Sequence, residues 1–273
     1  MPSELAQNVF SLLKRDLFSE GNIDNAKLNQ SLRLLAKWRS VLIQNTLLSH
    51  EGTRITRGPF KGMDFLAESA EGCHIAKLIG TYEQPLHPHI ERISESSYKK
   101  VINIGCAEGY YATGLALRMP NSKIFAYDTN KKAQEACCQL AKKNKVIDRV
   151  EVFGEIKTED LTKQLLEDAI IFCDIEGGEM DLLDLDKAPA LRHVDIIVES
   201  HECLVPGITN TLKSRFSDTH DVTEVEDDGM RIFEDPPQWL LQFSHLDQLL
   251  ATWEWRAGPT PWLIMKNRNN CLD

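Results

Sequence analysis

From residue 100 onward, short apolar runs alternate with stretches whose apolar residues recur every three or four positions. The runs are rich in Val, Ile and Phe, which is typical of buried strands. Alternation of this kind predicts a doubly wound α/β fold, in which helices cover both faces of a mostly parallel sheet. Helical periodicity is clearest over 131–144 and 158–167, and the strands are expected at 101–104, 124–127, 150–153, 170–173 and 194–198.

The end of the chain follows a different pattern. Two further apolar runs, 222–225 and 262–265, are separated by a long insertion near 227–261. The insertion contains Pro236-Pro237 and a helical pattern over 244–253. Because no parallel crossover joins the two runs, they predict a terminal antiparallel pair, which brings the sheet to seven strands.

The first part of the chain predicts an N-terminal helical extension, residues 1–57, ahead of a main domain at 58–273. A helix is expected over 3–18, with Ser3 as its N-cap, ending near Gly21 and Asn22. A second helix over 25–48 has an apolar stripe: Leu28, Leu32, Leu35, Trp38 and Leu42. Two helices cannot bury such a stripe alone. The extension is therefore expected to be a docked lid or the arm of a homodimer.

Between the extension and the first strand, Gly and Pro are frequent. This composition predicts a small hairpin over 53–66, a short helix near 72–79, a loop at 80–83 and a helix at 90–97. His87 and His89 have a spacing that two metal ligands could use, but a solvated loop is the favoured interpretation.

Composition restricts the class of function. The net charge is −10 and the pI is about 5.3, which argues against a broad basic surface for nucleic acid. Seven cysteines without a Cys-x-x-Cys pair are typical of a reduced, intracellular protein. The first 20 residues lack a signal-peptide core, and no apolar run is long enough to cross a bilayer. We therefore expect a cytoplasmic protein without a membrane partner.

Acidic residues follow most of the predicted strands. The residues at or just past these ends are Asn103, Asp128, Glu155, Asp174 and Glu199. In doubly wound sheets, ligands bind outside the carboxyl ends of the strands. Four carboxylates there would repel a phosphate, and they suit a cationic, hydroxyl-rich ligand.

The glycine pattern after the first strand agrees with this expectation. Gly105, Ala107 and Gly109 are spaced by two, whereas a dinucleotide fingerprint needs Gly-x-Gly-x-x-Gly, and no P-loop Lys-Ser/Thr follows. The segment 103–109 resembles motif I of class I S-adenosylmethionine (SAM)-dependent methyltransferases. It departs from that motif because Asn103 replaces an acid and Ala107 replaces a glycine.

Later segments strengthen and narrow the resemblance. Asp128 and Glu155 stand where such enzymes bind the ribose hydroxyls and the adenine amino group. Asp174-Ile-Glu-Gly-Gly-Glu179 resembles the signature of FkbM-like methyltransferases, as do the blocks 58–63, 78–83 and 105–111. The resemblance covers roughly 58–205. It implies O-methylation of a hydroxyl on a sugar or natural product, with SAM as cofactor and a small molecule as acceptor.

The expected cofactor site combines the glycine turn, the acidic strand ends and the block before the first strand. Its members are Tyr82, Glu83, Asn103, Gly105, Cys106, Ala107, Gly109, Tyr110, Tyr111, Asp128, Thr129, Glu155 and Asp174.

Catalysis is expected two strands away from the glycine turn, at Asp174 and His201. Asp174 and Glu176 lie two apart at one strand end, and Glu199 and His201 repeat that spacing on the next. His201 is the preferred general base, because its ordinary pKa is about 6.5, and Asp174 is the alternative. The same four side chains could instead hold Mg²⁺ or Mn²⁺. In another interpretation, Glu176 and Glu179 cap the following helix.

Aromatic residues gather late in the chain: Trp239, Trp253, Trp255 and Trp262. Core packing is the favoured interpretation, with sugar stacking as the alternative. Arg256, Thr260 and Trp262 are candidates for the acceptor wall.

Three competing functions remain at this stage. An amine or a nucleic acid 2′-hydroxyl could replace the small hydroxyl as acceptor, or the domain could bind the cofactor without catalysis. A nicotinamide dehydrogenase is contradicted by Ala107 and Tyr110.

Overall fold

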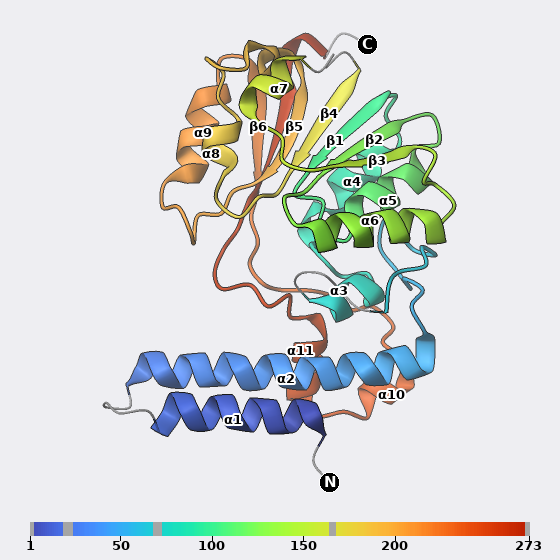
Figure 1. Ribbon diagram of the computed structural model, residues 1–273, viewed down its shortest axis with the longest axis vertical. Helices are drawn as coiled ribbons and strands as arrows, with labels where there is room; N and C mark the ends of the chain where they lie inside the picture. Colours follow the sequence, from blue (N-terminus) through green and yellow to red (C-terminus); the bar gives the residue numbers. More distant parts are fainter. Residues whose placement is uncertain (1–2, 19–23, 68–72, 164–167, 271–273) are drawn as a thin grey trace.

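The computed structural model describes residues 3–18, 24–67, 73–163 and 168–270. A seven-stranded sheet forms its centre, with an antiparallel pair of long helices at one end (Figure 1). The strands are β1 Lys100–Ile104, β2 Lys123–Tyr127, β3 Val150–Phe153, β4 Ala169–Cys173, β5 Asp195–Glu199, β6 His220–Val225 and β7 Trp262–Asn267. Predicted strands and observed strands differ by no more than two residues at either end.

The sheet order is β3-β2-β1-β4-β5-β7-β6. The first five strands in this order pair in parallel, and β7 runs antiparallel to both β5 and β6. The order reverses between β1 and β4, where Ile104 pairs with Cys173. The α/β fold class and the terminal antiparallel pair are as predicted from the sequence. A reversal of this kind opens a crevice at the carboxyl ends of the two strands.

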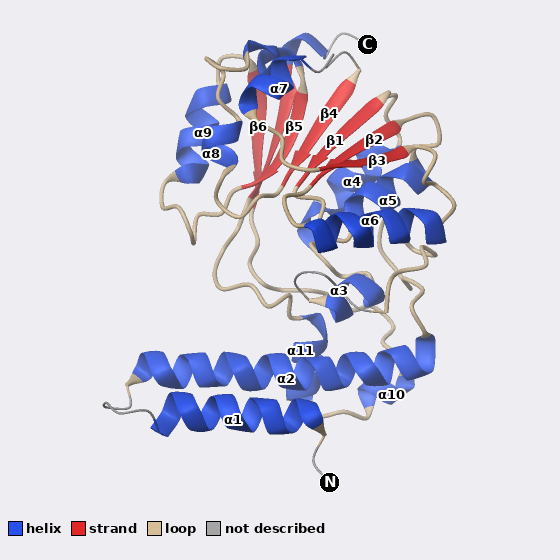
Figure 2. Cartoon of the chain, in the orientation of Figure 1, coloured by secondary structure: helices blue, strands red, loops and turns tan. Residues whose placement is uncertain are grey.

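Alternate residues of the central strands β1, β4 and β5 face two separate cores. On one face Val101, Ile170 and Ile197 pack against α4 His87–Ser94, α5 Tyr110–Arg118 and α6 Lys131–Lys143. On the other face Ile102 and Ile171 pack against α7 Thr158–Lys163, α8 Glu179–Leu182 and α9 Ile208–Phe216. Figure 2 shows the sheet between these helices. Burial on both faces explains why the strands are almost continuously apolar.

The N-terminal helices are α1 Glu4–Phe18 and α2 Asn25–Glu51. The helix α2 packs on α3 His74–Ile79 and on α11 His245–Thr252, and α10 Gln238–Leu241 precedes α11. Arg39 on α2 forms a two-bond ion pair with Asp247 on α11, at 2.6 and 2.7 Å. The extension thus contacts the insertion of its own chain.

The predicted stripe on α2 is only partly the packing face. Leu28, Leu32 and Leu35 are 51%, 65% and 41% exposed, whereas Ile43 and Leu47 are buried in the core. The prediction missed this because α2 packs on the main domain mainly through its C-terminal half. The buried positions there are Ser40, Ile43 and Leu47, which lie off the predicted stripe.

Several local expectations are corrected. His87 and His89 lie in the first turn of α4 and not in a loop, and the His87 ring nitrogen Nε2 is 2.9 Å from the Tyr82 carbonyl oxygen. The hairpin expected over 53–66 is present in short form, with an antiparallel bridge between Arg54 and Asp64 and backbone hydrogen bonds that join Thr53 to Phe65 and Ile55 to Gly62 and Met63. Gly21, Asn22 and the last residues of the predicted helix 158–167 lie outside the described residues. Among the described residues, no helix combines the length and hydropathy needed to span a bilayer.

Candidate active site

A pocket of about 890 Å³ lies at the carboxyl ends of β1 to β4, where the sheet order reverses. This volume suits a ligand of nucleoside size. Of the residues expected to bind a cofactor or a metal, eight line it: Tyr82, Gly105, Ala107, Asp128, Thr129, Glu155, Asp174 and Glu176.

The glycine turn forms the floor of this pocket. Gly105 has φ +78°, and its amide and that of Cys106 both donate to the Tyr127 carbonyl at 2.9 Å. A Cβ atom on Gly105 would overlap the Asp174 carbonyl oxygen, so the two strand ends approach as closely as backbone allows. Ala107 also adopts a left-handed conformation, with φ +46°, although the position is not glycine.

Asp128 joins the turn to the end of β2. Its Oδ2 accepts from the Ala107 amide at 2.9 Å and its Oδ1 accepts from the Asn130 amide at 2.8 Å. An ionised carboxylate has about four acceptor sites, so two remain for a ligand. The half-buried side chain is therefore held in place while still able to accept from hydroxyl groups in the pocket.

The remaining expected cofactor residues lie outside the lining of this pocket. Asn103 is buried, with its Nδ2 3.5 Å from the Phe172 carbonyl, and Cys106 and Gly109 face Cys137 on α6. Tyr110 packs in the core against Phe60 and Tyr82, while the Tyr111 hydroxyl donates to Glu83.

Carboxylates surround His201 beside the pocket. Its Nε2 lies 3.5 Å from Asp174 Oδ1, 3.5 Å from Glu176 Oε2 and 3.6 Å from Glu199 Oε2. The structure therefore brings together all four residues of the expected catalytic and metal cluster. His201 itself is buried, and it stands behind Asp174 and Glu176, which line the pocket.

The other ring nitrogen of His201 is held by Glu179. Nδ1 lies 2.7 Å from Glu179 Oε1, and this oxygen also accepts from the amides of Ile175 and Gly177 at 3.1 and 3.2 Å. Glu179 therefore binds the turn before α8 instead of capping the helix itself. Its contact with Nδ1 directs Nε2 toward the three carboxylates.

Burial lowers the pKa of His201, but the hydrogen bond with Glu179 and the charges of Glu199 and Glu176 outweigh it and leave that pKa raised. For Asp174, burial comes first, and Glu199 and Glu83 add to it, so its pKa lies well above the ordinary range. The pocket end of the cluster is thus short of positive charge.

Arg256 is the principal cation in the cluster. Its guanidinium contacts Glu199 and Thr260, lies 2.7 Å from Glu83 Oε1, and lies 3.1 Å from both Asp227 and Glu254. Burial, with smaller contributions from the charges of Glu199 and Glu254, raises the pKa of Glu83 to about 7 against the opposing effect of Arg256. Arg256 was expected at the acceptor wall, whereas it lies among the acids.

Sequence analysis missed three members of this network. Arg231 pairs with Glu254 at 2.5 Å and with Asp227 at 2.9 Å, and all three side chains are buried. They belong to the insertion, where no motif marks them. The only available signal was an accumulation of acids and arginines in a segment that is otherwise apolar.

A second missed feature is a buried ion pair beneath the pocket. Lys77 on α3 binds Glu108 of the glycine turn, and its Nζ lies 4.9 Å from the centre of the Tyr82 ring. Lys77 also lines the pocket. Glu108 stands within the resembling block 105–111, and a charged residue inside a buried turn was the signal for a partner.

The tryptophans mainly pack. Trp262 is buried against Phe172 and Tyr111, and Trp239 stacks on His50 of α2. The ring of Trp253 lies against Arg33 and the ring of Trp255 lies against Lys37, and both cations belong to α2.

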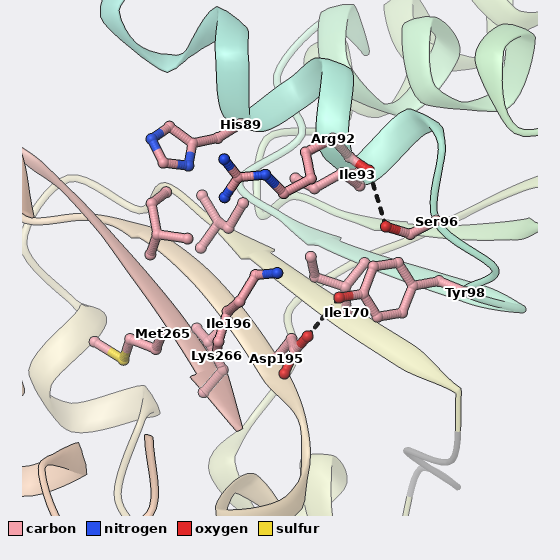
Figure 3. Close-up of a pocket in the computed structure, with 12 residues that line it drawn as sticks. His89, Arg92, Ile93, Ser96, Tyr98, Ile170, Asp195, Ile196, Met265 and Lys266 are labelled. Atoms are coloured by element: carbon pink, nitrogen blue, oxygen red, sulfur yellow. Dashed lines mark hydrogen bonds between the residues drawn. The ribbon is translucent and has the colours of Figure 1, made fainter. Parts of the chain in front are cut away.

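A separate cavity lies between α4 and strands β5 and β7, with His89, Arg92 and Lys266 around it (Figure 3). Its volume is about 20 Å³, which is room for a single water molecule. The Tyr98 hydroxyl donates to Asp195 at its edge. It is therefore too small to compete with the pocket at the strand ends.

Solved structures with a related arrangement include several methyltransferases. An O-methyltransferase from Bacillus cereus, in complex with SAH, is 12% identical, with 98% of this chain and 92% of that chain covered and a TM-score of 0.42. An O-methyltransferase of tomaymycin synthesis from Streptomyces achromogenes, in complex with SAM, is 11% identical, with 97% and 100% covered and a TM-score of 0.45. A SAM-dependent O-methyltransferase from Thermotoga maritima is 12% identical, with 68% and 65% covered and a TM-score of 0.43.

No protein-family model matches the chain. At these identities and TM-scores, the similarity decides neither the fold nor the chemistry of this protein. The fold follows from its own strand order, and the chemistry depends on its own residues.

The close approach at the glycine turn gives a prediction for Gly105→Ala. The new Cβ would force Gly105 away from Asp174, so we expect the free energy of unfolding to fall by at least about 4 kcal/mol. Gly62→Ala is the matched control, because Gly62 has φ +93° but nothing within 4 Å, and it should cost only about 1–2 kcal/mol. Both values come from denaturant unfolding. Equal losses in the two variants would contradict the close approach.

Proposed function

We propose that this chain is a SAM-dependent methyltransferase that acts on a hydroxyl group of a small molecule. One observation carries the proposal: around the glycine turn, the pocket at the sheet reversal is lined by more carboxylates than lysines. The carboxylates are Asp128, Glu155, Glu159, Asp174, Glu176 and Asp181, and the lysines are Lys77, Lys157 and Lys187. Such a lining opposes a nucleotide phosphate and suits a nucleoside that carries a positive charge. SAM combines a nucleoside with a sulfonium cation.

The cofactor is proposed to lie along the strand ends in one orientation. Asp128 has two acceptor sites left for the ribose hydroxyls, and Glu155 on the next strand accepts from the adenine amino group. The positively charged methionine end then lies toward Asp174, on the other side of the glycine turn. Because the pKa of Asp174 is raised by burial and by neighbouring acids, a cation there would favour its ionised form.

The chemistry of transfer follows from this orientation. The acceptor oxygen forms a bond to the methyl carbon while the bond from carbon to sulfur breaks, and the sulfur leaves neutral. The hydroxyl proton must go to the protein, and Asp174 is the group that faces the pocket. His201 Nε2, 3.5 Å behind it, shares that proton, and Glu179 holds the ring in this orientation.

Mg²⁺ or Mn²⁺ at Asp174, Glu176, Glu199 and His201 is the alternative way to assist the hydroxyl. The donor atoms converge on His201 Nε2, and carboxylate oxygens suit either ion. Two features weigh against the metal. One Glu199 oxygen already binds Arg256, and a raised pKa of His201 favours a proton on Nε2 over a metal.

Calorimetry with SAM tests the proposal directly. We expect binding by the wild type and a loss of roughly tenfold or more in affinity for Asp128→Ala, because the ribose loses its acceptor. Asp148→Ala, on an exposed residue away from the pocket lining, is the control and should bind normally. If the wild type does not bind SAM at millimolar concentration, both a methyltransferase and a passive SAM-binding domain are excluded.

The His201 imidazole gives a second prediction. Its pKa, followed by NMR, should lie above 6.5, and Glu176→Gln should lower it by removing a nearby negative charge. Only the neutral ring can share the acceptor's proton, so methyl transfer should be lost as pH falls through this raised pKa. In Glu176→Gln, the pH at which methyl transfer falls to half of its maximum on the acid side should move to a lower value. If this midpoint does not move while the pKa measured by NMR falls, His201 is excluded from proton transfer.

Chelation separates the base from the metal. With tritiated SAM and a panel of hydroxyl-bearing small molecules, we expect transfer to persist in EDTA, because Asp174 and His201 remove the proton without an ion. His201→Gln should reduce transfer by about 10²-fold or more. Loss of transfer in EDTA, restored by Mn²⁺, would favour the metal.

A further inference from the structure

Two residues in or next to the ion pairs of Arg256 have backbone conformations that are unfavourable for residues with a side chain. Glu83 has φ +50° and Trp255 has φ +66°, both in the left-handed region. For a bulky residue such as tryptophan this costs on the order of 1–3 kcal/mol and persists only where surrounding contacts enforce it. Neighbouring contacts must therefore hold both residues in these conformations.

Arg33 on α2 enforces the conformation at Trp255. Its guanidinium donates to the Trp255 carbonyl at 2.9 Å and to the Arg256 carbonyl at 3.0 Å, and it lies 5.7 Å from the centre of the Trp253 ring. Lys37, one turn further along α2, places its Nζ 5.1 Å from the centre of the Trp255 ring. One face of α2 therefore contacts residues 253–256 through both their backbone carbonyls and their aromatic rings.

The same segment enforces the conformation at Glu83 in turn. The Glu83 amide donates to Glu254 Oε1 at 2.9 Å, and the Glu83 carboxylate accepts from Arg256 at 2.7 Å. The neighbouring residue, Tyr82, lines the pocket. Contacts therefore run without a break from α2, through residues 253–256, to the pocket wall.

We propose that Arg33 is a positioning residue for the pocket: it fixes the turn at Trp255 that directs Glu254 and Arg256 onto Glu83 and so places Tyr82. In naming the pocket a SAM site, this inference rests on the proposed function. The contacts themselves do not depend on it. The N-terminal extension, expected to be a lid or a dimer arm, gains a third role as a support for the active site.

The first arm of the test needs no cofactor. Hydrogen exchange of full-length Arg33→Ala should show faster exchange at 253–260 and at the Glu83 amide, which is bound by Glu254. Arg39→Ala is the matched control, because it breaks an ion pair between α2 and α11 without touching either carbonyl that Arg33 binds. It should leave the Glu83 amide as protected as in the wild type.

The second arm measures SAM affinity by calorimetry. Arg33→Ala should lose roughly tenfold, Arg33→Lys should recover part of the loss by donating to one carbonyl, and Arg39→Ala should bind normally. The inference is overturned if Arg33→Ala retains both protection and affinity, or if Arg39→Ala loses as much of both as Arg33→Ala does.

The two arms also separate the inference from the proposed function. If the wild type does not bind SAM, the methyltransferase proposal fails, and hydrogen exchange at Glu83 still decides whether Arg33 positions the pocket wall.

Discussion

The candidate active site depends on the ion pairs that the Arg256 guanidinium forms. The guanidinium binds acids from the segment before β1, from the end of β5 and from two parts of the insertion: Glu83, Glu199, Asp227 and Glu254. A buried charge pair adds little net stability, but removal of one partner leaves the other buried and uncompensated. Loss of Arg256 would leave Glu83 and Glu199 without the arginine that pairs with them, whereas Asp227 and Glu254 would keep their ion pairs with Arg231. The insertion is therefore a structural part of the site, although it is distant from the motifs in sequence.

This dependence explains why the pocket is charged unevenly. Arg256 and Arg231 neutralise the side toward the insertion. Among the described residues, Asp174 and Glu176 beside His201 form no ion pair with an arginine, and Glu199 forms one through a single oxygen. The unbalanced side is the side that the pocket reaches. A cationic ligand would supply the missing positive charge, and that charge would be lost when methyl transfer leaves the sulfur neutral. That asymmetry favours binding of a sulfonium over its neutral product on electrostatic grounds.

The sequence predicted the parts of this structure that depend on periodicity and on strand ends. Both faces of β1, β4 and β5 are buried, so their apolar runs were visible, and parallel strands place Asp128 and Asp174 at one edge. Side-chain direction within the glycine turn was not predictable. At Cys106 and Tyr110 the chain follows left-handed residues, where neither the helical nor the strand period applies, and both side chains lie away from the pocket.

Contacts across the chain were also beyond the sequence, for a physical reason. Glu83 and Glu254 are separated by 171 positions, and they are joined by a hydrogen bond from the Glu83 amide and by ion pairs of both acids with Arg256. Contacts of this kind follow no sequence period. Their acids and arginines look like solvated surface until the fold buries them. Burial makes these residues important, because an ionisable group that is removed from water either pairs with an opposite charge or has its pKa shifted toward the neutral form. In this protein Arg231 and Asp227 pair, and the pKa of Asp227 is lowered. The pKa of Asp174 and that of Glu83 are raised by burial and by neighbouring acids, although Glu83 also contacts Arg256. The acids whose pKa is raised lie at or next to the pocket wall, where a cationic ligand would favour their ionised forms.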